Sequence, residues 1–168
     1  MAGGDTMRLL ICGGRTFSDI TMLHMGILQV CEMMGQRLTL VIHGDAPGAD
    51  SLAQGWCEFN GVPTLRFPAA WSDLNVTGVR LRFGRHGAYN AAAGSQRNQR
   101  MLDEGRPDAW LALPGGSGTA DMTARCKRAG LPGLLRRLKV SELKADWFRS
   151  QCTSANALFD SRKCERTR

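Results

Sequence analysis

The glycine-rich segment 114–119 (PGGSGT) is the part of this chain whose residue types point most directly to chemistry. It follows the apolar run 109–113, which predicts a buried strand that ends at the proline. Residues 118–129 are predicted to form a helix, with Ser117 or Thr119 near its N-terminus. Glycines expose backbone N–H groups, and the positive end of a helix dipole attracts anions. The segment therefore predicts an anion site, and we expect the anion to be phosphate. The alternative is a tight strand-to-helix turn without a ligand.

Two further glycine-rich loops also follow apolar runs, one at 13–15 after the run 8–12 and one at 44–50 after the run 38–42. The C-terminal ends of parallel strands share one edge of a sheet, so the three loops are expected to line one crevice. The ligand-binding residues predicted there are Gly13, Gly14, Arg15, Gly44, Asp45, Gly48, Ala49, Asp50, Arg97, Asn98, Pro114, Gly115, Gly116, Ser117, Gly118 and Thr119.

Arg97 and Asn98 bring the polar chemistry that a phosphorylated sugar requires. Arg97 has a permanent charge and a forked donor set for phosphate or a ribose-linked oxygen. Asn98 can hydrogen-bond a sugar hydroxyl or a base edge. The alternative for Arg97 is an ion pair with Asp103 or Glu104, on or near the same helix.

Known cofactor motifs are missing from the sequence. The first loop lacks the Gly-x-Gly-x-x-Gly spacing of dinucleotide sites, and no Gly-Lys-Ser or Gly-Lys-Thr occurs. The six cysteines are widely spaced, with no Cys-x-x-Cys pair, which is typical of reduced thiols in a cytoplasm. We therefore expect no cofactor, no metal and a cytoplasmic location.

Strands and helices that alternate along the chain must position these loops. Strands are predicted at 8–12, 38–42, 64–67 and 109–113, and helices at about 18–34, 49–60 and 118–129. Ser18 or Asp19 is expected to cap the first helix, and Gly61 to end the second. Apolar strands separated by helices predict a mostly parallel sheet covered on both faces, which is a three-layer α/β/α architecture.

The connection 72–92 is long for a compact domain and carries several arginines. Long loops are often functional lids, so a lid or specificity element is one interpretation. A plain surface hairpin is the other, because residues 79–83 alternate apolar and basic side chains.

Length and charge indicate a single domain with a basic end. The 168 residues are 43% hydrophobic, with no apolar run of the roughly 20 residues that span a bilayer and no secretory signal.

The net charge of +7 arises beyond residue 124, where twelve basic residues face four acidic ones. We predict a domain at 1–132 and a basic extension at 133–168, helical or partly disordered, and leave open a further strand after Pro132. The basic segment is interpreted as a solvated surface, with weak nucleic-acid binding as the alternative.

Four ordered segments, ICGGR at 11–15, HGDAPGAD at 43–50, AG at 93–94 with RNQRML at 97–102, and PGGSGTADM at 114–122, resemble the YspA/YpsA-related branch of the SLOG superfamily. That superfamily includes the LOG phosphoribohydrolases, the DNA-processing protein DprA and nucleotide-sensing domains of defence systems. The resemblance covers roughly residues 8–131. It implies a Rossmann-like fold that binds a nucleotide or a nucleotide-derived ligand, usually as a homodimer or larger assembly.

Compared with LOG enzymes, segment 114–119 resembles their phosphate loop and Arg97 resembles their arginine. Their glutamate, three residues after the loop threonine, is replaced here by Met122. The nearest carboxylate is Asp121, rotated by about 100° on a helix. The resemblance therefore favours a sensor or carrier of an ADP-ribose-like compound or nucleoside phosphate. The alternative is a nucleoside 5′-monophosphate phosphoribohydrolase.

In that enzyme, Arg97 and Asp121 are the candidate catalytic residues. Asp45 or Asp50 could replace Asp121, although each could instead bind ribose or cap the helix after Gly48. A weaker alternative is DprA-like nucleic-acid binding through the basic end. No membrane partner is expected.

Overall fold

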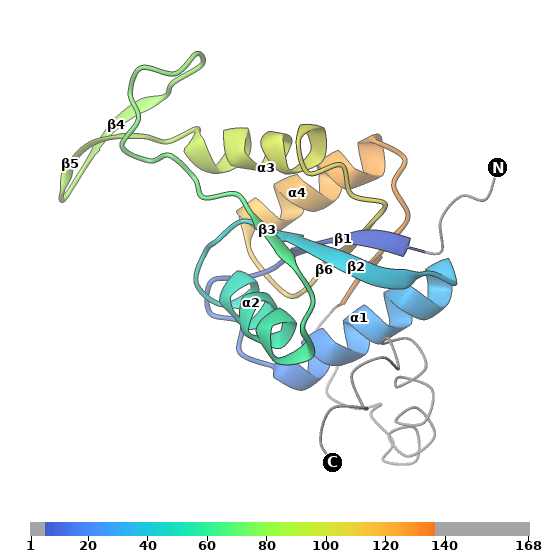
Figure 1. Ribbon diagram of the computed structural model, residues 1–168. Coiled ribbons are helices and arrows are strands. Elements are labelled where there is room, and N and C mark those ends of the chain that lie inside the picture. The colour runs from blue at the N-terminus through green and yellow to red at the C-terminus, as the bar shows by residue number, and fades with distance from the viewer. Residues whose placement is uncertain (1–5, 137–168) are drawn as a thin grey trace.

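Helices and strands alternate in the computed structural model, which describes residues 6–136 (Figure 1). The strands are β1 (Thr6–Cys12), β2 (Arg37–His43), β3 (Thr64–Arg66), β4 (Leu81–Gly84), β5 (Gly87–Asn90), β6 (Ala109–Ala112) and β7 (Gly133–Leu135). The helices are α1 (Ile20–Met34), α2 (Ala49–Asn60), α3 (Ala93–Asp103) and α4 (Ser117–Arg128).

Five parallel strands form the central sheet in the order β3-β2-β1-β6-β7. Helices α1 and α2 cover one face of this sheet, and α3 and α4 cover the other (Figure 1). This arrangement confirms the predicted Rossmann-like three-layer fold. The chain passes from β1 outward through β2 to β3, and then returns to the other side of β1 as β6. The strand order therefore reverses between β1 and β6, which is where open α/β sheets bind ligands.

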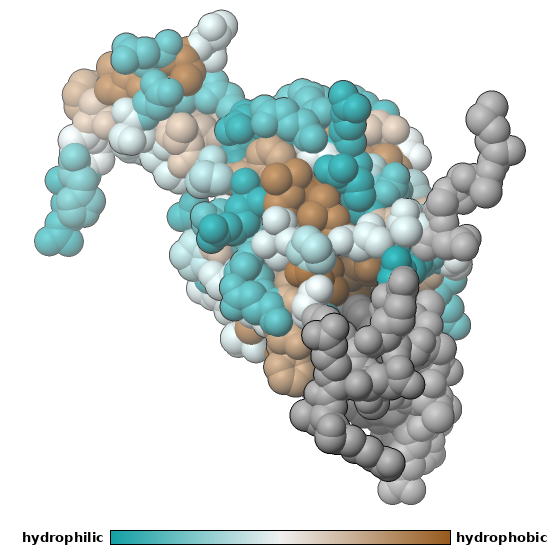
Figure 2. Space-filling model, in the orientation of Figure 1, coloured by the Kyte–Doolittle hydropathy of each residue, from teal (hydrophilic) through white to brown (hydrophobic). Residues whose placement is uncertain are grey.

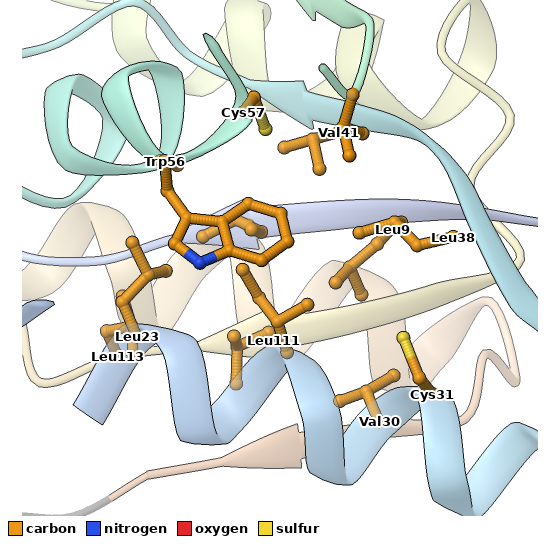
Figure 3. Close-up of a cluster of buried hydrophobic side chains, with 14 of the residues drawn as sticks. Leu9, Leu23, Val30, Cys31, Leu38, Val41, Trp56, Cys57, Leu111 and Leu113 are labelled. Carbon is orange, nitrogen blue, oxygen red and sulfur yellow. The ribbon is translucent and has the colours of Figure 1, made fainter. Parts of the chain in front are cut away.

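The central strands are anchored by two hydrophobic cores, because consecutive residues of a strand point to opposite faces. Leu9 lies on the face of α1 and α2 in a cluster with Trp56 and Leu111 (Figure 3). Leu10 lies on the other face, in a cluster that includes Met122 of α4. All except Trp56 are at most 1% exposed. The loops that leave β1 and β6 thus start from the most deeply buried part of the molecule.

The helices begin and end at residues with recognisable capping chemistry. The Asp19 carboxylate accepts a hydrogen bond from Met22 N at 2.8 Å and caps α1, as predicted. Gly61 ends α2 in the left-handed conformation (φ 66°), also as predicted. Helix α4 begins differently from α1, because its N-cap is Gly116 and no side chain caps it; α2 and α3 also lack a side-chain cap. The start of α4 therefore has exposed backbone donors.

Residues 81–90 form an antiparallel hairpin, β4 and β5, which projects from the body of the molecule (Figure 1). Leu81 and Phe83 are 53% and 80% exposed and give this hairpin a hydrophobic surface (Figure 2). The stem is built around Asn90, which is fully buried and whose side chain accepts hydrogen bonds from Arg80 N and Ala92 N. The connection 72–92 thus contains the hairpin that was one of its two interpretations.

A final strand follows Pro132. Strand β7 pairs in parallel with β6, and a Cβ on Gly133 would overlap the Trp110 ring, so only glycine fits there. Arg136 N also donates to Ala112 O at 2.8 Å. The segment predicted as a basic extension therefore begins within the sheet. Its remainder, 137–168, with the expected helical or partly disordered conformation, lies outside the described residues, and the division at residue 132 stays a prediction.

Candidate functional site

A crevice of about 620 Å³ opens beyond the C-terminal ends of β1 and β6, at the switch point of the sheet. Of the predicted site residues, those that line it are Gly13, Gly14, Arg15, Gly44, Asp50, Arg97, Asn98, Gly116, Ser117, Gly118, Thr119 and Asp121. Those that do not line it are Asp45, Gly48, Ala49, Pro114 and Gly115. Parts of all three loops therefore meet at one crevice, together with the start of α3.

Several of the predicted glycines join the loops to one another. A Cβ on Gly14 would lie 2.9 Å from Pro114 O, and one on Gly115 would lie 2.7 Å from Gly14 N. Gly48 has a φ of +82°, and its Cβ would overlap Gly14 O. Gly14 N donates to Pro114 O at 2.9 Å, and Ala49 N donates to Gly14 O at 3.1 Å. This close backbone packing holds the first loop against the second and third loops.

Gly116 and Gly118 have a different environment, because a Cβ at either position would have no heavy atom within 4 Å. Both line the crevice. Gly116 is the N-cap of α4, and the first intrahelical bond runs from Ala120 N to Gly116 O at 3.0 Å. The preceding N–H groups of the helix lack intrahelical acceptors, as at any helix start. Open backbone donors at a positive dipole end can bind an anion.

Arg97 enters the crevice from α3 and is fixed on two sides. Its Nη1 donates to the Gly44 carbonyl and lies 3.8 Å from Asp50 Oδ2, and its Nε donates to Asn98 Oδ1 at 3.0 Å. The Arg97 side chain is only 16% exposed. Burial lowers the pKa of Arg97, and the charge of Asp50 opposes this effect. The guanidinium is therefore a pre-positioned cation at the crevice wall.

The alternative that Arg97 pairs with an acidic residue at the end of its own helix is wrong. Glu104 pairs with Arg100, with 2.8 Å between Nε and Oε1, in an exposed i,i+4 contact. Asp103 accepts a hydrogen bond from Gln99 Nε2 at 2.9 Å. Both acidic side chains thus have partners one turn earlier on α3.

Asp50 closes the second loop. Its Oδ2 accepts hydrogen bonds from Gly44 N at 3.1 Å and Ala46 N at 3.2 Å, and the side chain is 8% exposed. Burial raises the pKa of Asp50, and the backbone donors together with Arg97 and His43 oppose the rise. The carboxylate thus orders the loop and balances the Arg97 charge.

Asp45 contacts Arg66 and not Arg97, the partner of Asp50. It has a φ of +54°, and its Oδ1 lies 3.8 Å from Arg66 Nη1 in an exposed pair. The N-cap of α2 is Gly48, and no side chain caps that helix. The expectation that Asp45 or Asp50 caps the helix after Gly48 is therefore wrong. The physical reason is that Asp50, already in the first turn of α2, bonds back to the loop that precedes the helix.

Asn98 and Asp121 are linked in a network between α3 and α4. Asn98 Nδ2 donates to Asp121 Oδ2 at 2.9 Å and to Gly118 O at 3.2 Å. Arg125 Nε donates to the same Asp121 oxygen at 3.0 Å, and its Nη2 reaches Ser95 Oγ at 2.8 Å. Asn98 is 4% exposed. Its amide therefore positions the start of α4 against Arg97.

The ionisation of Asp121 follows from this network. Partial burial alone would raise the pKa of Asp121, but hydrogen bonds from Arg125 and Asn98 and the charge of Arg125 lower it on balance. Met122, at the position of the LOG glutamate, is 1% exposed and belongs to the core beneath α4. The crevice thus contains an ionised carboxylate at 121, whereas the side chain at 122 is directed into the core.

Sequence reasoning missed some of the lining residues, namely Cys12, Ala46, Trp71, Ala91, Gly94, Ser95 and Met101. Trp71 is the largest of them and is 39% exposed, with the Arg15 guanidinium 5.7 Å from its ring centroid. A tryptophan directly before a polar, glycine-rich loop was a signal that could have found it. Burial raises the pKa of Cys12 far above its ordinary value, so its thiol is neutral.

Residues 6–136 contain neither a candidate metal cluster nor a candidate membrane-spanning helix. No group of three or more His, Cys, Asp or Glu side chains in this part of the chain is arranged to hold a metal ion. Nor does any helix in the same range combine the length and apolar character needed to cross a membrane.

A parallel sheet with helices on both faces and a crevice at its switch point defines a Rossmann-like α/β protein. Residues 7–73 match the family model YAcAr, the YspA, cpYpsA-related SLOG family, and this match supports the assignment of the chain to that family. The matched segment contains the first two loops and Trp71, but neither Arg97 nor the start of α4. No curated protein matches the chain significantly. The match is consistent with a nucleotide-related binding or LOG-like role.

Proposed function

We propose that this protein binds a nucleotide-derived small molecule, such as a nucleoside phosphate or an ADP-ribose-like compound, and does not turn it over. In this proposal the phosphate lies at the N-terminus of α4, and the protein acts as a sensor or carrier. The crevice volume of about 620 Å³ falls within the roughly 300–1,000 Å³ typical of small-molecule sites.

The observation that carries the proposal is the open backbone at Gly116 and Gly118. These are the glycines of the third loop with free space above Cα, and they line the crevice at an uncapped helix start. Packing within the protein does not require glycine at these two positions. Close approach of a ligand to the main chain does require it.

Donor groups at the crevice wall favour an anionic ligand. Arg15 and Arg97 both line it, and the uncapped N-terminus of α3 adds Gly94 and Ser95 to the same wall. Arg97 Nη1 lies 3.8 Å from Asp50 Oδ2, so the carboxylate partly balances the charge of the guanidinium. The forked guanidinium has further donors for a phosphate or ribose oxygen.

The state of the carboxylates favours binding without turnover. A general acid works best with a pKa near the operating pH, whereas the pKa of Asp121 is lowered. Asp50 is engaged by two backbone donors and Arg97. Among the described residues that line the crevice, these are the two carboxylates, and each already has a structural role.

A second candidate function is LOG-like hydrolysis of the N-glycosidic bond in a nucleoside 5′-monophosphate. It is favoured by one observation, the position of the ionised Asp121 carboxylate on the crevice wall. An anionic carboxylate can stabilise an oxocarbenium-like transition state. If it did so here, Asp121→Asn would reduce turnover by about two to four orders of magnitude with little change in ligand affinity.

The test measures binding and product on the same samples. The purified protein is titrated by calorimetry with AMP, ADP-ribose and adenosine, and each mixture is then analysed by chromatography for free adenine. We expect the phosphorylated ligands to bind more tightly than adenosine, with no adenine released. Arg97→Ala should weaken AMP binding about 10- to 150-fold, the scale of one charge-assisted hydrogen bond of about 1.5–3 kcal/mol.

Arg100→Ala is the matched control, because Arg100 lies on the same helix but pairs with Glu104 outside the crevice. Its AMP affinity should equal that of wild type. Circular dichroism checks that both variants are folded. Failure of folded wild-type protein to bind any phosphorylated ligand would refute the proposal. Adenine release by wild type, but not by Asp121→Asn, would establish the second candidate instead.

A further inference from the structure

We infer that Trp71 is the stacking wall for a nucleobase, so that the ligand is a nucleotide with an intact aromatic base rather than a phosphorylated sugar. This inference rests on the proposed function, because it assumes that the phosphate lies at the N-terminus of α4. It adds the element that would distinguish one phosphate-bearing ligand from another.

Trp71 belongs to the same crevice as the open glycines of α4 and presents an aromatic surface to it. The side chain is 39% exposed, whereas Trp56 and Trp110 are 6% and 4% exposed in the two cores. One edge of the indole lies against the first turn of α3, where a Cβ on Gly94 would come within 3.3 Å of Cη2. The rest of the indole surface lies outside both hydrophobic cores.

The backbone around Trp71 is fixed by the stem of the hairpin. Asn90 N donates to Trp71 O at 2.8 Å, and the Asn90 side chain is itself held by three hydrogen bonds, including one to Gln96 Oε1 at 2.9 Å. Asn90 is fully buried. The indole is thus attached to a rigid support, as a stacking platform requires.

Arg15 connects the indole to the phosphate end of the crevice. Its guanidinium lies 5.7 Å from the ring centroid of Trp71, in a cation–π contact. Arg15 also shares a second hollow with Gly115 and Gly116 beside the crevice. A base that stacks on the indole would replace this guanidinium and leave Arg15 free to contact the phosphate. Base and phosphate would therefore be recognised by one coupled rearrangement.

Stacking on an aromatic side chain recognises any nucleobase, since every base has a π face. The ligand class that fits is therefore a nucleoside 5′-phosphate or a compound that contains one. A phosphorylated sugar would satisfy the phosphate donors and leave the indole uncovered.

The experiment compares the affinities of the four nucleoside 5′-monophosphates with that of ribose 5-phosphate, by calorimetry. For wild type we expect the tightest monophosphate to bind about 5- to 150-fold more tightly than ribose 5-phosphate, the range for one base stacked on an aromatic side chain. Trp71→Ala should remove this difference without weakening the binding of ribose 5-phosphate. Trp71→Phe should keep most of it.

Fluorescence supplies a second measurement. Nucleotide binding should quench wild-type tryptophan emission more than that of Trp71→Phe, which still binds but lacks the stacked indole. Phe59→Ala is the matched control, because Phe59 is 92% exposed and lies at the end of α2, outside the crevice. It should change neither affinity nor quenching.

The outcomes separate this inference from the proposed function. Equal affinity of wild type for the monophosphates and ribose 5-phosphate would overturn the inference and leave phosphate binding intact. An equal loss of affinity for both ligands in Trp71→Ala would also overturn the inference. If neither ligand binds to folded wild-type protein, both proposals fail. If Trp71→Ala does not fold, Trp71→Phe and the wild-type comparison still decide the question.

Discussion

Two neighbouring glycines in the loop after β6 should respond in opposite ways to the same substitution. Gly116→Val adds a side chain where a Cβ meets no heavy atom within 4 Å, at an extended backbone with φ −95°. Gly115→Val adds it where a Cβ would lie 2.7 Å from Gly14 N. The first substitution should block the ligand, and the second should damage the fold.

The expected magnitudes follow from these environments. A valine at 116 would prevent a phosphate from reaching the N–H groups at the start of α4. Loss of two charge-assisted hydrogen bonds, about 1.5–3 kcal/mol each, predicts a fall in AMP affinity of roughly 10²- to 10⁴-fold. Stability should fall by only about 1 kcal/mol, because valine is a poorer N-cap than glycine. At 115, overpacking should cost about 1–3 kcal/mol or more.

The assay pairs calorimetric titration with AMP and urea unfolding of each variant. Gly116→Val should unfold near the wild-type midpoint and bind AMP at least a hundredfold more weakly than wild type does. Wild-type affinity in a folded Gly116→Val protein would refute the assignment of the anion to α4. A Gly115→Val protein as stable as wild type would refute the division between packed and open glycines.

Two further predictions concern pH and the basic end of the chain. Because hydrogen bonds from Arg125 and Asn98 hold the pKa of Asp121 below its ordinary value, ionised Asp121 stabilises the fold above that ordinary value. This contribution is lost as the pH falls through the lowered pKa. In urea unfolding between pH 6 and pH 2, the free energy of unfolding should therefore decrease less for Asp121→Asn than for wild type. An equal decrease for both proteins would show that Asp121 does not stabilise the fold in this way. For the basic end, wild type should bind an oligonucleotide only weakly and lose it as salt rises, because phosphate contacts release counterions. If a tight complex formed at physiological salt and truncation after Arg136 abolished it, residues 137–168 would bind nucleic acid. The truncation is placed after Arg136 because β7 ends at Leu135.

Local patterns in the sequence were enough to predict the architecture. The alternation of apolar strands and helices led to the three-layer fold, and Asp19 and Gly61 marked helix ends that the structure confirms. These features depend on residues within one or two turns of each other. The C-terminal ends of β1 and β6 could be expected to share an edge for the same reason, because parallel strands in one sheet run in one direction.

Features that depend on distant contacts could not be predicted in this way. Arg97 pairs with Asp50, from a different loop, whereas sequence spacing pointed to the acidic residues one or two turns away on α3. The glycines of the third loop look alike in sequence, and only their neighbours in space separate Gly115 from Gly116. The role of the basic end and the expected homo-oligomer remain predictions.

The register of α4 provides the strongest structural reason to favour binding over catalysis. Asp121 and Met122 are consecutive, so their side chains diverge by about 100° around the helix. Asp121 faces the crevice, and Met122 packs in the core with Leu10 and Trp110. A carboxylate at 122 would be buried among apolar side chains, at a high desolvation cost, unless α4 rotated. Such a rotation would break the contacts of Asn98 with Gly118 and Asp121, which position the start of the helix beside Arg97. The contacts that hold the proposed anion site in place therefore oppose the placement of a LOG-type glutamate at 122, which is why the proposed function is ligand binding.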